Sequence, residues 1–440
     1  MVDRIKVLEI DLNQPLAGFS GLEDYNSIHA VVRWRGDPVG YIDVPLCNGH
    51  CSASAIRAAI LKVHSDNLLH SMVRRDLDAP FSDIQDLENA KATGDTDSAA
   101  RADNTLVTVA VCTRDRAEQL KDCLTSLSKL AYSKVDILVV DNAPSTDETR
   151  KLVQSEFPDF RYVVEPRPGL DWARNRAIDE ARGEILAYTD DDVLVDPLWV
   201  SALVKVFQDD PAVMAVTGLV APFEMETQAQ VLFERYGGFG RGFKRIWYHV
   251  DFTSRGDSFL HIGAGKFGTG ANMAYRRAVF GKIGEFDPAL DVGTVTNGGG
   301  DLEMFFRVLE EGHTLVYEPA ALVWHRHRRT YKELHVQLTN HGIGLYSYFM
   351  RSARNYPRRR REIIRFGLWW FWYWNIRRFL KSYITTPRVP RDLILAELRG
   401  ALIGVTRYPK ARRRAEEIRA EYRSESRVSP GGIPEPARSE

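Results

Sequence analysis

The chain has 440 residues, which is long enough for more than one domain and for a sizeable core. With 44% hydrophobic and 27% charged residues, its composition is that of an ordinary globular protein. This excludes a chain that is disordered throughout, a collagen-like chain and a low-complexity array. Lys+Arg and Asp+Glu each number 59, so the basic bias of a nucleic-acid binder is missing and we expect no nucleic-acid partner.

The neutral total hides an uneven distribution of charge. Residues 351–440 contain 22 basic and 9 acidic residues, net +13, which leaves 37 basic and 50 acidic residues, net −13, in residues 1–350. The N-terminus has no signal-peptide pattern, and no apolar stretch reaches the about 18 residues that cross a bilayer. With only four cysteines, the chain fits a reducing compartment. We therefore predict a cytoplasmic location.

The N-terminal region predicts a small α+β module over residues 1–78. Its strands are expected at Ala30–Trp34 and Gly40–Val44, and its helix from about Ser54 to Arg75. Residues 79–104 are acidic and rich in small side chains, which is typical of a linker.

A domain over residues 105–335 is predicted to be α/β. Short apolar, β-branched runs alternate there with segments of helix length, which indicates βαβ units and a mostly parallel sheet with flanking helices. The runs are Leu106–Val111, Val135–Val140, Arg161–Val164 and Ile185–Tyr188. Ligands of open parallel sheets bind outside the carboxyl ends of the strands, so the residues that follow each run are the candidates for a site.

The C-terminal part predicts a basic, aromatic helical region over residues 336–423 and a disordered tail over 424–440. Four arginines, Arg358–Arg361, precede the aromatic-rich segment Phe366–Trp374. A basic helix that carries Trp and Tyr can lie in a membrane interface, so we expect a peripheral position on an anionic membrane surface, the inner face of the cell membrane. The alternative is that these aromatic residues pack on the preceding domain and belong to its core.

Three consecutive aspartates, Asp190 to Asp192, follow the fourth run. Adjacent like charges raise one another's pKa unless a cation lies among them, and Asp190 and Asp192 can both reach one Mg²⁺ or Mn²⁺ ion. The alternative is a solvated acidic loop.

Asp141 follows the second run and can accept an N–H from a nucleobase, or can simply form a turn. Arg174 can clamp a diphosphate, or can be an ordinary surface arginine.

Asp301 follows three glycines and begins an apolar helix. There the helix dipole keeps a carboxylate ionised and usable as a general base, although a simple N-cap explains the residue equally well. Glu303 can position an acceptor or favour the first helical turn. His325 ends an apolar run and can be a metal ligand, a structural histidine or part of a phosphate-facing patch with the arginines that follow.

Several motifs, taken in chain order, resemble those of the family 2 glycosyltransferases. In the nucleotide-binding half they are Val109–Arg114, Val139–Asn142, Gly169 with Ala173–Asn175, and Thr189–Asp192; in the acceptor half, Gly268–Met273 leads to Gly300–Glu303. The resemblance covers residues 106–330 and implies the GT-A fold and an inverting, metal-dependent enzyme. The family commonly has Glu before its base, whereas Gly300 stands before Asp301 here.

The resemblance implies a role for each matching position. Asp301 is the expected catalytic base, and Asp190, Asp192 and His325 are the expected ligands of Mn²⁺ or Mg²⁺. Residues expected at the donor nucleotide are Thr113, Arg114, Asp141, Arg174, Asp190 and Asp191. Residues expected at the acceptor or sugar are Gly270, Asn272, Gly300 and Glu303.

The sequence therefore predicts transfer of a sugar from a nucleotide sugar, a UDP-sugar, to a hydroxyl group of a glycan or glycolipid. Two alternatives remain open: a sugar-phosphate nucleotidyltransferase, which also uses a carboxylate-bound metal, and a non-catalytic sugar-nucleotide-binding protein.

Overall fold

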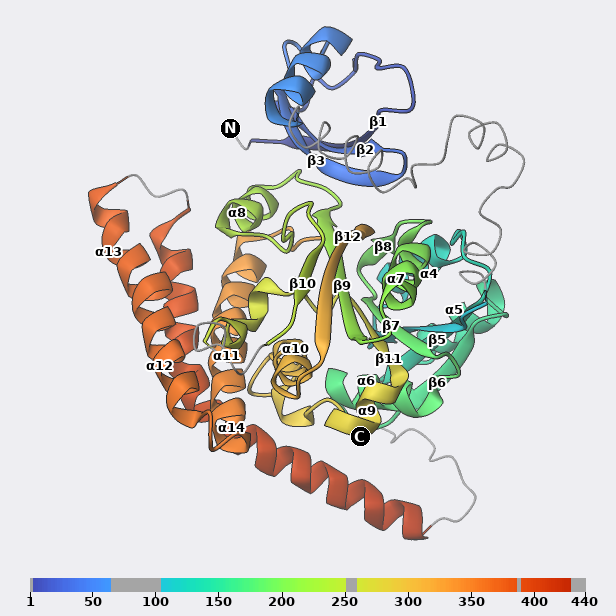
Figure 1. The fold of residues 1–440 in the computed structure, drawn as a ribbon, viewed down its shortest axis with the longest axis vertical. Helices are drawn as coiled ribbons and strands as arrows, with labels where there is room; N and C mark the ends of the chain where they lie inside the picture. The colour runs from blue at the N-terminus through green and yellow to red at the C-terminus, as the bar shows by residue number, and fades with distance from the viewer. Residues whose placement is uncertain (1–2, 65–103, 251–258, 386–388, 429–440) are drawn as a thin grey trace, which may run out of the picture.

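The computed structural model describes residues 3–64, 104–250, 259–385 and 389–428. These form a small N-terminal sheet with a helix, a large central sheet with helices on both faces, and a group of long C-terminal helices (Figure 1). Most of the expected linker, and the expected N-terminal helix beyond His64, lie outside the described residues.

The N-terminal sheet has three strands. Strand β2 (Ser27–Trp34) pairs antiparallel with β3 (Asp37–Pro45), where the sequence predicts two strands, and a helix covers residues 53–64. Strand β1 (Ile5–Asp11), which the sequence analysis missed, pairs parallel with β2.

The N-terminal sheet packs against one end of the central sheet (Figure 1). The backbone N–H of Ile5 donates to the carbonyl of Met225 at 2.9 Å. Arg33 forms a buried ion pair with Asp196, and Val31 packs in a small apolar cluster with residues of the central sheet. The two units are therefore joined by both apolar and charged contacts.

The central sheet has the strand order β10-β12-β9-β11-β7-β4-β5-β6, with β8 paired to β12. Strands β4 to β7 run parallel, as predicted, whereas β11 is antiparallel to both its neighbours and β10 is antiparallel to β12. The strands are β4 (Val107–Thr113), β5 (Val135–Asn142), β6 (Arg161–Glu165), β7 (Ile185–Asp190), β8 (Val193–Val195), β9 (Val213–Pro222), β10 (Ile246–Tyr248), β11 (Asn272–Arg276) and β12 (Thr314–His325).

Helices cover both faces of this sheet because its central strands are apolar on both sides. Val109 and Val111 of β4 belong to one core cluster and Ala110 to the other, as expected from alternating side chains. The helices of this region are α4 (Ala117–Leu127), α5 (Glu148–Glu156), α6 (Leu170–Glu180), α7 (Trp199–Asp209), α8 (Gln228–Tyr236), α9 (Phe280–Ile283) and α10 (Gly300–Glu310). Five short 3₁₀ or π segments complete it and its C-terminal extension, namely η1 (Leu260–Ile262), η2 (Ala264–Lys266), η3 (Arg277–Val279), η4 (Pro288–Leu290) and η5 (Phe371–Ile376).

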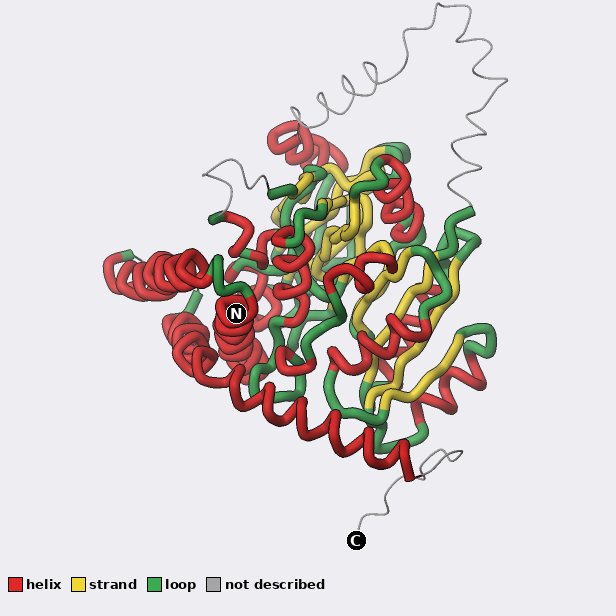
Figure 2. The backbone as a smooth tube through the Cα atoms, turned by 60° about the horizontal axis from the view of Figure 1, so that its bottom comes forward, coloured by secondary structure: helices red, strands yellow, loops and turns green. Residues whose placement is uncertain are grey.

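The C-terminal helices are α11 (Tyr331–Asn355), α12 (Arg360–Trp370), α13 (Arg377–Ile384) and α14 (Arg391–Val428), with η5 joining α12 to α13. Helices α11 and α14 cross closely because glycines face each other's backbone: a Cβ on Gly400 would lie 2.0 Å from the carbonyl oxygen of Thr339. Farther along, α14 crosses beneath the domain and packs against Trp172 of α6 (Figure 2).

Two expectations for this region can be compared with the structure. Helix α14 continues through Val428, so the segment expected to be disordered from residue 424 begins as helix, while residues 429–440 lie outside the described part. Among the described helices, none combines the length and the apolar character needed to cross a membrane.

Candidate active site

The candidate site lies where the parallel strands end. Asp190, the last residue of β7, is in register with Cys112 of β4, so Thr113 and the loop that follows Asp190 meet at one edge of the sheet. The end of β12 reaches the same place, because the backbone N–H of Arg326 donates to the carbonyl of Asp192 at 3.1 Å. The topology thus brings His325 to the aspartates.

Asp190, Asp192 and His325 form a group suited to a metal ion. Each offers one ligand atom, and these atoms all lie within 4.8 Å of one another. Nε2 of His325 is 3.4 Å from Oδ1 of Asp192, and Nδ1 of His325 is 3.1 Å from Nδ1 of His327. His327 contacts Glu234 at 2.7 Å through Nε2. This chain of contacts fixes the orientation of the His325 ring, as outer residues commonly do for metal-bound histidines.

The electrostatics of the group fit a divalent cation. Burial, reinforced by the charge of Asp192, raises the pKa of Asp190 to about 7. Burial lowers the pKa of His325 to about 4, so its imidazole is neutral and able to ligate at neutral pH. Two carboxylates and a neutral imidazole are a donor set for Mn²⁺ or Mg²⁺. These residues therefore fit the predicted metal.

Asp301 lies in the first turn of α10 with both carboxylate oxygens directed by backbone groups. Oδ2 accepts the N–H of Gly270 at 2.9 Å, and Oδ1 accepts the N–H of Leu302 at 2.9 Å. Each oxygen keeps a further lone pair that can take a proton. Gly270, predicted near the acceptor, is thus the residue that orients the predicted base.

Arg174 lies between three carboxylates rather than at an open surface. It is buried and contacts Asp171 at 3.0 Å, and its other guanidinium nitrogen would lie 2.5 Å from a Cβ on Gly270. Although burial opposes it, the charges of Asp171, Asp190 and Asp301 raise the pKa of Arg174. Arg174 is therefore a buried counter-ion of Asp171 whose charge also acts on Asp190 and Asp301, and its predicted contact with a diphosphate stays a prediction.

Asp171 is a buried carboxylate that the sequence analysis did not single out. Burial raises its pKa to about 7, and its Oδ2 has no hydrogen-bond partner among the described residues. A Cβ on Gly300 would lie only 2.0 Å from that oxygen. The glycine that departs from the family pattern therefore leaves room for the carboxylate of Asp171 beside Asp301.

Asp141 combines a fixed and a free oxygen. Its Oδ2 accepts the hydroxyl of Tyr162 at 2.7 Å, while Oδ1 is buried without a partner among the described residues. Burial raises the pKa of Asp141 to about 6, so the group is mostly ionised at neutral pH. A free carboxylate oxygen can accept a ligand N–H, and the predicted contact of Asp141 with a nucleobase stays a prediction. Arg114, the neighbour expected at the nucleoside, extends into solvent with half of its side chain exposed.

Thr113 and Asp191 contact each other instead of standing free for the donor. The Thr113 hydroxyl donates to Oδ2 of Asp191 at 2.8 Å, and Arg116 donates to Oδ1 of Asp191 at 2.8 Å. Arg116 also lies 3.4 Å from Asp192. The pair therefore holds the aspartate loop against β4, and the predicted contacts of both residues with the nucleotide stay predictions. Arg116 was overlooked, although it stands in the first strand-to-helix turn.

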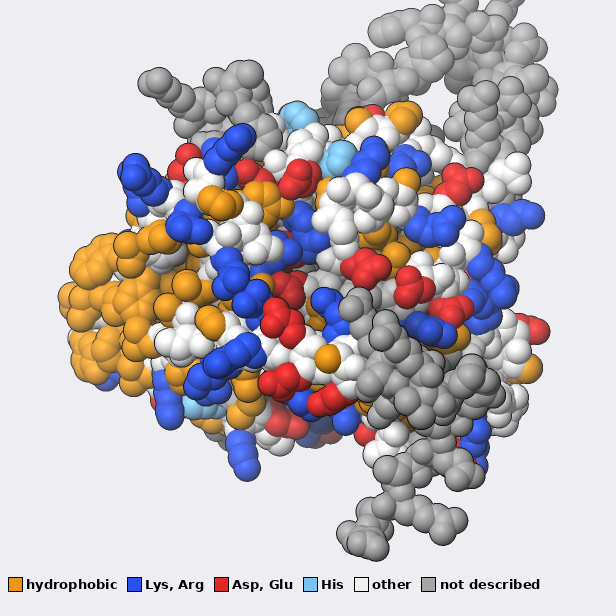
Figure 3. Space-filling view, turned by 90° about the horizontal axis from the view of Figure 1, so that it is seen from below, with side chains coloured by type: hydrophobic (Ala, Val, Ile, Leu, Met, Phe, Trp, Pro, Cys, Tyr) orange, Lys and Arg blue, Asp and Glu red, His pale blue; other side chains and the backbone are white. Residues whose placement is uncertain are grey.

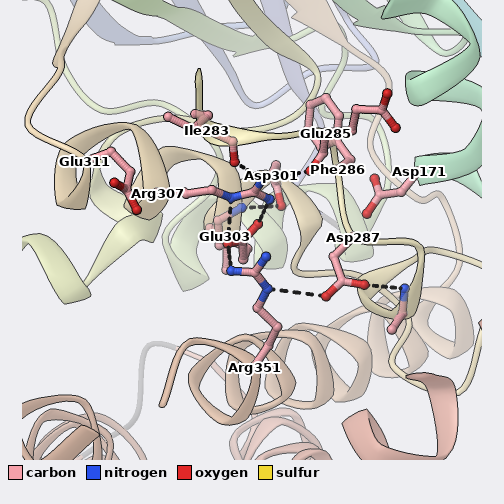
Figure 4. Close-up of polar contacts among 12 residues, drawn as sticks. Asp171, Ile283, Glu285, Phe286, Asp287, Asp301, Glu303, Arg307, Glu311 and Arg351 are labelled. Atoms are coloured by element: carbon pink, nitrogen blue, oxygen red, sulfur yellow. Dashed lines mark hydrogen bonds and ion pairs between the residues drawn. The ribbon is translucent and has the colours of Figure 1, made fainter. Parts of the chain in front are cut away.

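Two residues expected at the acceptor have partners within the fold, and Figure 4 shows those of Glu303. Glu303 is fully buried and forms ion pairs with Arg307 and Arg351, so its carboxylate does not face a ligand. Asn272 is also buried; its amide donates to two backbone carbonyls and its oxygen accepts the indole N–H of Trp199 at 2.9 Å. Both residues therefore have partners within the fold, and their predicted contacts with the acceptor stay predictions.

The comparisons with known proteins indicate the class of enzyme to which this fold and site belong. Residues 108–284 match the family model described as Glycosyl transferase family 2. The chain is therefore an enzyme of the glycosyltransferase class, with a segment similar to glycosyltransferase family 2 and the mixed α/β sheet expected of the GT-A fold.

Curated relatives and solved structures are similar over part of their length. A glucosyl-dolichyl phosphate glucuronosyltransferase from Haloferax volcanii is 24% identical over 50% of this chain and 69% of its own. Polypeptide N-acetylgalactosaminyltransferase 5 from Caenorhabditis elegans is 27% identical over 45% of this chain, but the match spans only 33% of that protein. A mannosyltransferase from Pyrobaculum calidifontis, solved with GDP-Man and Mn²⁺, has 18% identity and a TM-score of 0.39 over 75% of this chain and 76% of its own.

Proposed function

We propose that this enzyme is an inverting, metal-dependent glycosyltransferase that moves a sugar from a nucleotide sugar to a hydroxyl group of a glycan or glycolipid. The observation that carries the proposal is that Asp190, Asp192 and His325 offer ligand atoms within 4.8 Å of one another, while Asp301 is held separately by the backbone N–H groups of Gly270 and Leu302. One site suits a metal-bound diphosphate, and the other suits a proton acceptor.

The residues divide the reaction between them. Asp301 takes the proton of the acceptor hydroxyl, whose oxygen forms a bond to the anomeric carbon while the bond from that carbon to the diphosphate oxygen breaks. Asp190, Asp192 and His325 would hold Mn²⁺ or Mg²⁺, which supplies charge neutralisation for the departing diphosphate. Backbone N–H groups of Gly270 and Leu302 keep the Asp301 carboxylate oriented while it accepts the proton.

A UDP-sugar is the donor that we propose. The free Oδ1 of Asp141 lies buried beside the Tyr162 hydroxyl, and an ionised carboxylate there can accept the imide N–H of uracil. The relatives differ in the sugar that their names carry, so the sugar itself is left to experiment.

We also propose that the enzyme works in the cytoplasm at a membrane surface, since its C-terminal helices are basic and aromatic.

The test combines binding with product analysis. UDP should raise the thermal stability of the protein in the presence of Mn²⁺ and much less in its absence, because a ligand of the folded state stabilises it. Asp192→Ala should remove the Mn²⁺-dependent part, whereas Asp179→Asn, an exposed carboxylate in α6, should retain it. Transfer from an α-linked UDP-sugar should give a β-linked product by NMR. A retained configuration would contradict the mechanism, and binding without turnover over a broad acceptor panel would favour a non-catalytic protein.

A further inference from the structure

The C-terminal helices expose large apolar side chains on the surface of the described part of the chain. The structure divides the aromatic segment into a buried and an exposed half. Ile363 and Phe366 are buried in the main core, whereas Leu368 is 66% and Trp372 58% exposed. The alternative that these aromatic residues belong to the core of the preceding domain therefore holds for only one face of the helix.

The exposed half continues over neighbouring helices. Figure 3 shows hydrophobic side chains gathered in one broad area over the C-terminal helices, with Lys and Arg side chains at its borders. The large apolar residues exposed on α12, η5 and α13 are Ile364, Leu368, Trp369, Trp372, Tyr373, Leu380, Tyr383 and Ile384. We call this set the apolar face. Contiguous exposed apolar areas of this kind mark interaction sites rather than ordinary surface.

The apolar face is surrounded by positive charge. Residues 358–384 contain eight Lys or Arg residues and one acidic residue, Glu362, a net charge of +7. Arg361, Arg365, Arg377 and Lys381 are exposed. Such a surface is attracted to anionic lipid head groups.

The aromatic residues of this face are held in place by one another. Trp369 stacks on Tyr373 with ring centroids 5.2 Å apart, and the guanidinium of Arg377 lies 4.2 Å from the centre of the Tyr373 ring. Trp and Tyr favour the boundary between lipid chains and head groups, where Arg can reach the phosphates. The side chains are thus arranged as an interfacial membrane anchor requires.

We propose that the apolar face inserts into the interfacial layer of a lipid bilayer with anionic head groups, with the flanking arginines and Lys381 on the phosphates. A second copy of the chain fits less well, because pairing two such faces would bring two surfaces of net charge +7 together. The inference rests on the membrane position included in the proposed function and names the residues that make the contact. It concerns a surface other than the transfer site and can be measured without turnover.

The experiment is flotation of the full chain with phosphatidylcholine vesicles that contain or lack phosphatidylglycerol. We expect binding to the anionic vesicles and at least about tenfold weaker binding for the triple variant L368S/W372S/I384S, whose three side chains are all exposed. The matched control is L61S/V63S, because both residues are exposed apolar side chains of the N-terminal helix at 56% and 54%. The control should float like the unmodified protein.

A second readout tests insertion on the unmodified chain. Brominated lipids should quench tryptophan fluorescence, because Trp369 and Trp372 enter the bilayer. Equal flotation of the triple variant, or binding that salt abolishes and that brings no quenching, would overturn the proposal. Failure to float together with a dimer in light scattering that the triple variant loses would overturn it in favour of a second copy.

Discussion

Arg351, near the end of helix α11, forms a buried ion pair with Glu303, which lies two residues after Asp301 in helix α10 (Figure 4). Arg351 also contacts Asp287 at 3.3 Å, and Asp287 accepts the hydroxyl of Tyr408 from α14 at 2.9 Å. The helix that carries the proposed base is thus fastened to the C-terminal helices by a charged network. The C-terminal helices therefore help to hold Asp301 in place, although none of the residues proposed to hold the metal or the donor comes from them.

Removing Arg351 should therefore destabilise the enzyme. Arg351→Ala leaves the buried Glu303 with one fewer cation, and breaking such a pair typically costs about 3–5 kcal/mol of unfolding free energy. Arg354→Ala, in the same helix but exposed, should change it by less than about 0.5 kcal/mol. Urea unfolding of the two variants checks the difference. Equal stabilities would mean that the network contributes little to the fold.

Asp301→Asn should abolish acceptor activation without weakening the donor. Loss of a general base typically lowers the rate by about 10²- to 10⁴-fold, while binding of UDP with Mn²⁺ should stay near that of the unmodified enzyme. The matched control is Asp179→Asn, which should keep both. Because Glu303 is buried in ion pairs, it is no longer a plausible substitute base. A near-normal rate in Asp301→Asn would instead direct attention to Asp171.

The parallel half of the sheet could be predicted because its strands carry β-branched runs that are buried on both faces. The runs at β4 and β5 are short and apolar, and each ends at a polar residue of the site. Strand β11 gave no comparable signal. It contains Asn272 and ends at Arg276, and it is a strand because it is enclosed between β7 and β9. Tertiary pairing, which the local sequence does not encode, determines it.

The metal group was predictable in part, because its residues follow apolar runs in the sequence. Asp190 and Asp192 are two residues apart, so their spacing alone brings them together, and His325 was found only as the polar end of a strand. Burial was not predictable. Glu303 has the position of an acceptor contact in the sequence, but Arg351, which pairs with it, lies 48 residues away. Asp171 was overlooked because its importance depends on the space left by Gly300.

Gly300→Ala should impair the reaction through Asp171. The added Cβ would lie 2.0 Å from Oδ2 of Asp171, so that carboxylate must move and its contact with Arg174 must change. We expect a fall of at least about tenfold in kcat with a smaller change in UDP affinity, because a small misplacement of catalytic groups has large effects on rate. Gly281→Ala is the matched control, since nothing lies within 4 Å of its added Cβ. Unchanged kcat in Gly300→Ala would show that Asp171 can shift freely.

Asp141→Asn should raise the stability of the enzyme at pH 8 and lower its affinity for UDP. Burial raises the pKa of Asp141 from 3.8 to about 6, so the folded state binds its proton more tightly than the unfolded state does. The resulting destabilisation is absent below pH 3.8, develops as the pH rises through 6, and is complete above it. From that shift we estimate about 1–3 kcal/mol at pH 8. An uncharged Asn that still accepts the Tyr162 hydroxyl would remove this cost.

The variant should therefore be more stable than the unmodified enzyme at pH 8, and the gain should shrink towards pH 4. At the same time its affinity for UDP should fall by about tenfold or more, because a hydrogen bond to a charged acceptor is lost. Urea unfolding at several pH values and calorimetry with UDP measure the two effects, with the exposed Asp159→Asn as control. A variant that is stabilised but binds UDP normally would show that the free oxygen of Asp141 does not contact the base. Loss of both stability and binding would mean that the carboxylate is needed by the fold itself, through a partner that only an ionised group can satisfy.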